Sequence, residues 1–336
     1  MVRPLLAALL LLSTSGYAYA KQTPVRKASS SARTIRISLS TTEITRIPLE
    51  RINGAIVLPA LIGGRHASLL FDNGSDVTVV DREFATNNGL NIGYQAGGLN
   101  TGLSTMKTNR VEASMVVGQA VTIEGQFIAA DLGPISRALG RPIAGVIGAD
   151  ALAALIVVIN PTSGWVAFGT PGHLGTRNRT TATRASGSDA TGLTKPEMRM
   201  PAEIPFGPGY DMMALIDGHP VSLQIDYGST GAVTLRADIW RRLVLPAAQT
   251  GGVSASTRAD GLKISEKIGS LRELAFGSVT IRDVPAASQA GSNRVKYEGL
   301  IGLAVLGSST TILDTPRRRL WIFPPDQEVN VFAITE

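Results

Sequence analysis

Two copies of one short motif, Asp-x-Gly-Ser, are the part of this sequence best suited to carry chemistry, and each follows an apolar segment. The residues are Asp72, Asn73, Gly74 and Ser75 in the first copy and Asp226, Tyr227, Gly228 and Ser229 in the second. A carboxylate at the end of a buried strand is costly unless it is paired or hydrogen-bonded. Glycine two positions later lets the backbone approach another group closely, and serine three positions later offers a hydroxyl to the carboxylate. Two such carboxylates can form one acid–base pair.

The two motifs lie within a longer internal duplication. Asp226 follows Asp72 by 226 − 72 = 154 positions, and residues 59–75 resemble residues 213–229. Three other pairs of segments keep the same offset, namely 144–148 with 298–302, 159–161 with 313–315, and 97–99 with 251–253. Four landmarks at one offset indicate a duplicated lobe and not a short-period solenoid. The duplication places the two aspartates where a pseudo-twofold axis can bring them together.

The hydrophobic pattern predicts that each half is built from β-strands with a few short helices. Hairpin strands are expected at 56–61 with 67–71 and at 212–216 with 221–225, and further strands at 77–80, 232–235, 111–117, 121–129, 268–276 and 279–284. Short helices are predicted at 81–88 and 236–243, and Asp150 is expected to cap a third helix at 151–155. Each Asp-x-Gly-Ser motif would then connect two apolar strands.

This pattern resembles the pepsin-like and retropepsin-like aspartic proteases, in particular their compact bacterial members. Besides the two turns, the segments 146–148 (Val-Ile-Gly) and 300–302 (Leu-Ile-Gly) match the hydrophobic-hydrophobic-Gly strand past which the family threads its turn in a ψ-shaped loop. The resemblance covers most of residues 50–323. It implies an all-β fold of two pseudo-symmetric lobes with pepsin/retropepsin-like β-barrel architecture. It also implies that Asp72 and Asp226 are catalytic and that the other six motif residues support them.

The chemistry implied by the resemblance is peptide-bond hydrolysis. Two carboxyls about 3 Å apart do not both ionise easily, so they share one proton and their pKa values split. The ionised carboxyl is then a general base for a water molecule, and the protonated one donates to the substrate carbonyl. Because the pair titrates as a unit, the proton is not assigned to Asp72 or to Asp226. No metal, cofactor or covalent intermediate is required.

The residue after each aspartate departs from the family, which has Thr or Ser there with hydroxyls that interlock beneath the dyad. This chain has Asn73 and Tyr227 instead. Asn73 keeps a donor and an acceptor for hydrogen bonds across the interface, whereas Tyr227 is bulkier and requires a rearrangement. The departure leaves open an alternative, a catalytically degenerate fold that binds peptides or acts as an envelope scaffold.

A glycosidase is a third alternative, because retaining and inverting glycosidases also use two carboxylates. Their carboxyls lie about 5 Å or more apart. The spacing between Asp72 and Asp226 therefore decides between this class and a shared-proton dyad.

The family closes a flap over its bound peptide, and the best candidate by position is 97–110, with 251–264 as its partner in the second half. The segment 97–110 is rich in Gly and Thr, as suits a mobile loop. It lacks the Tyr found in pepsin flaps, so an ordinary surface hairpin is the alternative.

Composition restricts the class of protein further. The 336 residues are 44% hydrophobic and 17% charged, which indicates a globular chain with room for two lobes. The absence of Cys excludes disulfides, thiolate nucleophiles and thiolate zinc sites. The histidines, His66, His173 and His219, do not cluster, so neither a metal site nor a Ser-His-Asp triad is expected.

The first 20 residues have the pattern of a secretory signal. Arg3 supplies the positive start, residues 5–12 the apolar run, and residues 18–20 a small-x-small cleavage site. The apolar run is well below the roughly 20 residues that span a bilayer. We therefore expect a secreted or periplasmic protein without stable membrane insertion after cleavage; an uncleaved anchor is the alternative.

The expected organisation is a signal at 1–20, a flexible N-terminus at 21–45, one lobe at 46–170, a linker at 171–200 and a second lobe at 201–336. Removing residues 1–20 removes one charge, Arg3, so the formal net charge falls from +6 to +5. A modest positive charge favours anionic envelope polymers or nucleic acid as partners, but the basic residues are scattered along the chain. We expect a monomer that acts on a protein or peptide substrate and has no nucleic-acid partner.

Overall fold

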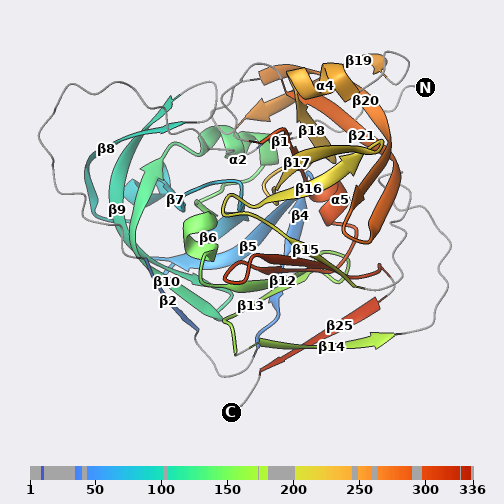
Figure 1. Ribbon diagram of the computed structural model, residues 1–336. Coiled ribbons are helices and arrows are strands. Elements are labelled where there is room, and N and C mark those ends of the chain that lie inside the picture. Colours follow the sequence, from blue (N-terminus) through green and yellow to red (C-terminus); the bar gives the residue numbers. More distant parts are fainter. Residues whose placement is uncertain are drawn as a thin grey trace, which may run out of the picture.

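The computed structural model describes residues 9–10, 35–39, 44–100, 105–172, 174–180, 201–243, 249–258, 263–289, 297–325 and 327–333. Within this part of the chain most residues lie in β-strands, and the helices are short (Figure 1). The prediction of an all-β fold with a few short helices is confirmed.

The first half forms a nine-stranded sheet, coloured blue to green in Figure 1. Its strands are β2 (Ile35–Leu39), β4 (Glu50–Ile52), β5 (Ala55–Ile62), β6 (Arg65–Phe71), β7 (Val79–Asp81), β8 (Ile92–Asn100), β9 (Thr105–Val117), β10 (Val121–Ala130) and β11 (Gly145–Ile147). The β5–β6 hairpin turns at Gly63 and Gly64, whose φ angles of 55° and 76° favour glycine. Strand β11 lies between β6 and β7, parallel to β6 and antiparallel to β7.

The second half repeats this arrangement in an eight-stranded sheet, coloured yellow to red apart from β1. Its strands are β1 (Leu9–Leu10), β16 (Asp211–Ile216), β17 (His219–Ile225), β18 (Val233–Arg236), β19 (Gln249–Arg258), β20 (Lys263–Phe276), β21 (Val279–Gln289) and β22 (Gly299–Ile301). The β16–β17 hairpin turns at Asp217 and Gly218, again with positive φ angles, of 50° and 83°. Strand β22 is parallel to β17 and antiparallel to β18, as β11 is to β6 and β7.

A third sheet joins the two halves. Its order is β15-β24-β23-β12-β13-β3, with bounds Ala202–Pro205, Arg319–Ile322, Thr311–Asp314, Ile156–Asn160, Trp165–Gly169 and Ile47–Pro48. Strands β12 and β23, one from each half, pair in antiparallel register with Val157 opposite Leu313. A separate two-stranded sheet pairs β14 (Leu174–Thr180) with β25 (Gln327–Ala333). The halves are thus fixed to each other by backbone hydrogen bonds.

The helices of the described residues are α1 (Arg82–Asn87), α2 (Gly133–Leu139), α3 (Ala149–Leu152), α4 (Ala237–Leu243) and α5 (Leu303–Leu306). Helices α1 and α4 lie where the sequence predicts them, and Asp81 caps α1 by accepting from the Phe84 N–H. Helix α3 begins two residues earlier than expected and Gly148, not Asp150, is its N-cap. Helix α2, which starts with Gly133 and Pro134, has no counterpart among the predicted elements.

Two stretches expected to lack regular structure contain strands. Strand β2 lies within 21–45 and pairs with β10, and β14 begins inside the expected linker 171–200. Of the expected signal, the structure describes Leu9 and Leu10, which pair with β19. Residues 181–200 lie outside the described part, so the linker there stays a prediction.

Candidate active site

Each Asp-x-Gly-Ser turn begins at the end of the central strand of its lobe. Asp72 follows β6, and its N–H donates to the Ile147 carbonyl of β11 at 3.1 Å. Asp226 follows β17 and donates in the same way to the Ile301 carbonyl of β22 at 3.0 Å. In each lobe the neighbouring parallel strand thus binds the aspartate N–H at the equivalent position, where the chain leaves the sheet.

The chain crosses itself closely behind each turn. A Cβ at Gly148 would lie 2.4 Å from the Val77 carbonyl, and one at Gly302 would lie 2.5 Å from the Gly231 carbonyl oxygen. Only glycine has room at such a crossing. Backbone hydrogen bonds from Ala149 N to Ser75 O, 2.7 Å, and from Leu303 N to Ser229 O, 2.8 Å, hold both crossings. This is the threaded arrangement that the resemblance implies for the hydrophobic-hydrophobic-Gly segments.

Backbone N–H groups orient the two carboxylates. In the first turn Gly74 N and Ser75 N donate to Asp72 Oδ1 at 2.9 and 3.2 Å. In the second turn Gly228 N and Ser229 N donate to Asp226 Oδ1 at 2.8 and 3.1 Å. The expectation that the serine hydroxyls hold the carboxylates is wrong in the first turn, because the Ser75 hydroxyl donates to the Val77 carbonyl. The Ser229 hydroxyl has no hydrogen-bond partner among the described residues.

The two turns face each other and bring the carboxyls together. A Cβ at Gly74 would lie 2.6 Å from Asp226 Oδ1, and one at Gly228 would lie 2.1 Å from Asp72 Oδ1. Each glycine therefore makes room for the carboxylate of the other lobe. Asp72 and Asp226 are both fully buried, and their side chains lie within hydrogen-bonding reach, so that each shifts the pKa of the other. That contact is shorter than the about 5 Å or more of a glycosidase pair.

The environment raises the pKa of both aspartates. Burial is the largest cause for Asp72, and the nearby charge of Asp226 raises its pKa further. Burial also raises the pKa of Asp226, to about 7, against the opposing effect of the backbone N–H groups of Gly228 and Ser229. The contact between the carboxyls raises the pKa of Asp72 and lowers that of Asp226. Neither Oδ2 atom has a hydrogen-bond partner among the described residues, and two buried carboxyls this close to each other favour one shared proton.

Asn73 spans the two lobes beneath the dyad. Its Nδ2 donates to the Ile225 carbonyl at 2.7 Å, and its Oδ1 accepts from Tyr227 N at 2.8 Å. Both groups are buried backbone atoms next to Asp226. A carboxamide supplies both a donor and an acceptor. Asn73 therefore makes, from the first turn to the second, the hydrogen-bonding contact that a hydroxyl makes in the family.

Tyr227 points away from this interface into the core. Its hydroxyl donates to Thr311 Oγ1 at 2.6 Å, and its ring packs edge-on against Phe71 at 5.8 Å between centroids. Burial raises the pKa of the Tyr227 hydroxyl well above its usual range. The side chain that follows Asp226 thus stabilises the junction with the shared sheet and does not reach the first turn. Thr311 was not predicted, since no pattern in the sequence links it to Tyr227.

A second polar contact that the sequence did not predict supports the first turn. Thr78 N and Thr78 Oγ1 both donate to Asp150 Oδ1, at 2.8 and 2.6 Å, and Gly148 N donates to Thr78 Oγ1. The position of Asp150 two residues after Gly148 was visible in the sequence but suggested only a helix cap. In the structure Asp150 ties the crossing strand to the segment that follows Ser75.

Both flap candidates belong to antiparallel hairpins. Residues 97–110 fall in β8–β9 and residues 251–264 in β19–β20, although the tips 101–104 and 259–262 lie outside the described residues. In the first hairpin Leu99 and Met106 pack against the apolar cluster that contains Leu70, two residues before Asp72. The first hairpin therefore rests on the face of the sheet that carries the dyad.

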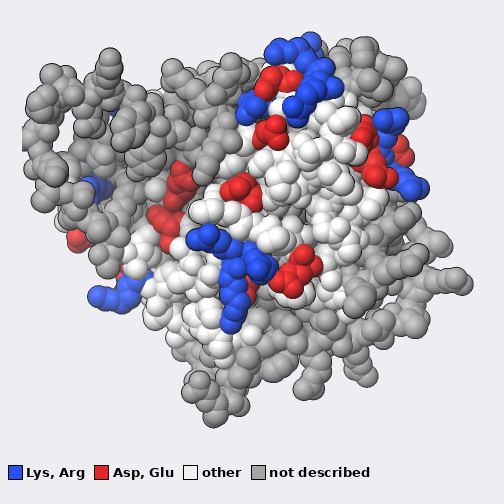
Figure 2. Space-filling model, viewed as in Figure 1, with Lys and Arg blue, Asp and Glu red and all other residues white. Residues whose placement is uncertain are grey.

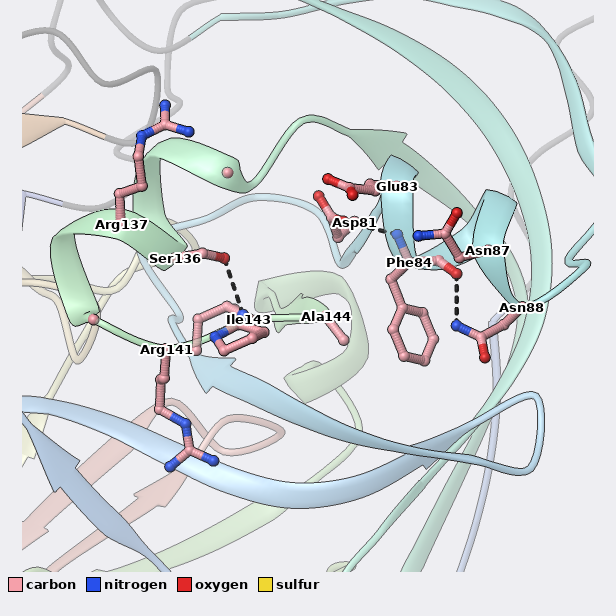
Figure 3. Close-up of a pocket in the computed structure, with 13 residues that line it drawn as sticks. Asp81, Glu83, Phe84, Asn87, Asn88, Ser136, Arg137, Arg141, Ile143 and Ala144 are labelled. Atoms are coloured by element: carbon pink, nitrogen blue, oxygen red, sulfur yellow. Dashed lines mark hydrogen bonds between the residues drawn. The ribbon is translucent and has the colours of Figure 1, made fainter.

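A cavity of about 540 Å³ lies elsewhere in the first lobe, between α1 and α2 (Figure 3). Phe84 comes from α1 and Ser136 from α2, while the guanidinium groups of Arg137 and Arg141 point away from the centre. Neither dyad aspartate lines it. Because chemistry needs both carboxyls, this cavity is not the candidate active site.

His66 and His219 lie at the start of β6 and β17, in the matching hairpins, and His173 is outside the described residues. Across the described ranges, no three residues of the metal-ligating types come close enough to hold an ion. None of the helices described is both long and apolar enough to cross a bilayer.

Comparison with known proteins agrees with this geometry. Residues 212–305 match the family described as aspartyl protease, and that range contains Asp226, its turn and β22. No curated protein matches the chain. The first half repeats the same turn, crossing strand and glycine contacts at the offset of 154 residues. The match in the second half, together with this all-β fold, supports an aspartic protease family of the retropepsin-like kind.

Proposed function

We propose that this protein is an endopeptidase that hydrolyses peptide bonds with a water molecule activated by Asp72 and Asp226. The observation that carries the proposal is the mutual approach of the two turns, in which Gly74 and Gly228 admit the opposite carboxylate. A general aspartic protease function follows from the family match at residues 212–305. The aspartates supply the one-proton pair that the chemistry requires.

The reaction needs no group beyond these carboxyls and water. The ionised carboxyl takes a proton from water as the water oxygen bonds to the peptide carbonyl carbon, while the protonated carboxyl donates to the carbonyl oxygen. The tetrahedral intermediate then collapses: the carboxyl that gave its proton takes one back from a hydroxyl of the intermediate, the C–N bond breaks, and the other carboxyl donates its proton to the leaving nitrogen. The products are a carboxylic acid and an amine, and the pair keeps one proton.

Access to the dyad requires movement, because Asp72 and Asp226 have no exposed surface in this state. The β8–β9 hairpin is the best candidate for the moving part, since Leu99 and Met106 lie on the dyad side of the sheet. Opening such a hairpin would admit a peptide, and closing it would exclude bulk water. The proposal therefore includes a flap function for residues 97–110.

We also propose that the protein is exported and that its partner is a protein or peptide substrate. The pattern of residues 1–20 supports export to the periplasm or the medium, where a protein or peptide would be the substrate. Figure 2 shows basic and acidic side chains next to one another over the visible face. The described residues also form ion pairs such as Arg319–Glu203 and Arg317–Asp314. A mixed surface supports the absence of a nucleic-acid partner. We propose a monomer.

The test is hydrolysis of a diverse peptide mixture by the full chain, followed by mass spectrometry from acidic to alkaline pH. Wild type should cut internal peptide bonds, and Asp72→Asn and Asp226→Asn should each lose at least about 1,000-fold in rate. Asp283→Asn, which changes an exposed aspartate, is the matched control and should retain full activity. If wild type cuts nothing, or the dyad variants cut as well as wild type, the proposal is wrong.

A binding protein without hydrolysis is the second candidate, and Tyr227 is the observation that favours it. Its side chain leaves the interface, so the second turn lacks the contact that Asn73 makes in the other direction. A binding protein would hold peptides with equal affinity in wild type and Asp72→Asn, and neither would release cleaved products. Calorimetry with peptides recovered uncut from the mixture distinguishes the two functions.

A further inference from the structure

The sheet face beside the dyad is apolar in the first lobe. One row crosses this face through four residues in direct register, Val57, Leu70, Val146 and Val79. Because Leu70 lies two residues before Asp72, the two side chains lie on the same side of the strand. The row packs with α2 in one apolar cluster. Beside Asp72, this row therefore consists only of apolar side chains, which are buried in this state.

The equivalent row in the second lobe is polar. It consists of Asp211, Gln224, Leu300 and Thr234, again in direct register. The first three keep the duplication offset, since 57 + 154 = 211, 70 + 154 = 224 and 146 + 154 = 300, and Thr234 pairs with Leu300 as Val79 pairs with Val146. Gln224 lies two residues before Asp226 and shares its side of the strand.

Two acceptors in this polar row have no donor. Gln224 is 2% exposed, and its Oε1 accepts no hydrogen bond from the described residues. The buried Oδ1 of Asp211 also lacks a donor in that part of the chain. A buried acceptor without a donor is costly, so natural proteins seldom keep one without a use.

Glycines allow the backbone to approach the Asp211 carboxylate closely. A Cβ at Gly207 would lie 2.5 Å from Asp211 Oδ1, and a Cβ at Gly209 would lie 3.5 Å from the same atom and 3.4 Å from the Tyr297 ring. Tyr297 stands where the first lobe has Ile143, since 143 + 154 = 297. Tyr297 is therefore a further polar residue beside this row, which we call the wall of the second lobe.

We propose that this wall of the second lobe selects a substrate side chain that carries N–H donors, either a carboxamide or a cation, directly beside the scissile bond. The carbonyl of Gln224 and the carboxylate of Asp211 accept from this side chain. The apolar row of the first lobe takes an apolar side chain on the other side of the bond. The inference rests on the proposed function, because it assigns the substrate class to the same dyad.

The experiment measures binding of peptides that carry a reduced, non-cleavable CH2–NH link, so it does not depend on turnover. Three peptides differ only in the residues flanking the link, which are Leu–Leu, Leu–Lys and Lys–Leu. Calorimetry with the full wild-type chain should show one mixed peptide binding at least about tenfold tighter than Leu–Leu. Which of the two mixed peptides, Leu–Lys or Lys–Leu, binds more tightly also identifies the side of the scissile bond on which the second lobe binds a side chain.

The variant Gln224→Leu tests the assignment, because leucine is the residue of the first lobe at this position. The preferred mixed peptide should lose about tenfold in affinity, and Leu–Leu should bind at least as well as before. Gln327→Leu, the same chemical change on β25, is the control and should leave all three affinities unchanged. Thermal unfolding of each variant reports whether it is folded.

The proposal is overturned if Leu–Leu binds best to wild type, if no peptide binds, or if Gln224→Leu leaves the ratio of affinities unchanged. Failure of hydrolysis with the predicted binding preference intact would instead overturn the proposed endopeptidase and leave this subsite standing. The two proposals therefore fail separately.

Discussion

The backbone N–H of Tyr227 donates a 2.8 Å hydrogen bond to Oδ1 of Asn73, a residue 154 positions earlier and at the equivalent place in the other lobe. The contact runs in one direction, because the Tyr227 side chain binds Thr311 and not the first turn. The two carboxylates are therefore related by the duplication, but the side chains that follow them bind different partners. Asn73 makes two hydrogen bonds from the first turn to the backbone on either side of Asp226.

Replacing Asn73 with Ala should destabilise the protein and impair the dyad. The change leaves two buried backbone groups, Tyr227 N–H and Ile225 C=O, without partners, which should cost about 3 kcal/mol in the free energy of unfolding. Urea unfolding checks the cost, and peptide hydrolysis checks the accompanying fall in kcat. Asn73→Thr, which restores one donor and one acceptor on the family's pattern, should recover most of both; equal loss in both variants would contradict a hydrogen-bonding role.

Tyr227→Phe should affect stability more than catalysis. The hydroxyl bonds Thr311 in the shared sheet and does not approach the carboxyls, so its removal should cost about 1–2 kcal/mol of unfolding free energy. Urea unfolding measures this cost, and kcat/KM should stay within about threefold of wild type. A large fall in kcat at unchanged stability would mean that the hydroxyl has a catalytic function.

The sequence predicted the features that repeat. The offset of 154 residues located both turns, both crossing glycines, both hairpin turns and helices α1 and α4, because each lobe must solve the same packing problem with the same residue types. Gly148 and Gly302 are an example, since the close crossing excludes any side chain in either lobe. The donor and acceptor of Asn73 were likewise deducible from its chemistry.

The features that break the symmetry could not be predicted from the repeat. The direction of the Tyr227 side chain depends on Thr311, which is distant in sequence and reaches the turn only through the shared sheet. Helix α2 begins with Gly133 and Pro134, a weak local signal for a helix that packing stabilises. The repeat already pairs Gln224 with Leu70, but the row that Gln224 forms across the sheet with Asp211, Leu300 and Thr234 requires the strand register.

Gly228→Ala should damage catalysis directly. Its Cβ would lie 2.1 Å from Asp72 Oδ1, so the carboxyls must move apart by a substantial part of an ångström. A misplacement of that size should lower kcat by about 100-fold or more. Single-turnover hydrolysis of a peptide substrate measures the effect. Gly64→Ala, at φ 76° with no atom within 4 Å of the added Cβ, is the matched control and should cost stability without loss of activity per folded molecule.

The dependence of kcat/KM on pH should show an acid limb near neutrality. The pKa of Asp226 is about 7 and that of Asp72 is raised as well, so Asp226 takes up a proton as pH decreases through about 7 and can no longer act as the general base. Activity should therefore fall as pH decreases through about 7, while circular dichroism over the same range shows the fold intact. Maximal activity in strongly acidic solution would contradict a dyad buried in this way.

The free energy of unfolding should depend on pH through the ionisation of Asp226. Burial raises the folded-state pKa of Asp226 from its ordinary 3.8 to about 7, so the protonated form favours folding at low pH and this contribution is lost as pH rises through about 7. Asp226→Asn keeps an oxygen acceptor for Gly228 N and Ser229 N but never ionises. The variant should match wild type at about pH 4 and become more stable than wild type by a few kcal/mol, on the order of the linkage energy, above about pH 7. Urea unfolding at several pH values measures the difference.

The control Asp283→Asn, which removes an exposed charge, should show no such trend with pH. If Asp226→Asn were less stable than wild type at every pH, the ionised pair would be stabilising the fold.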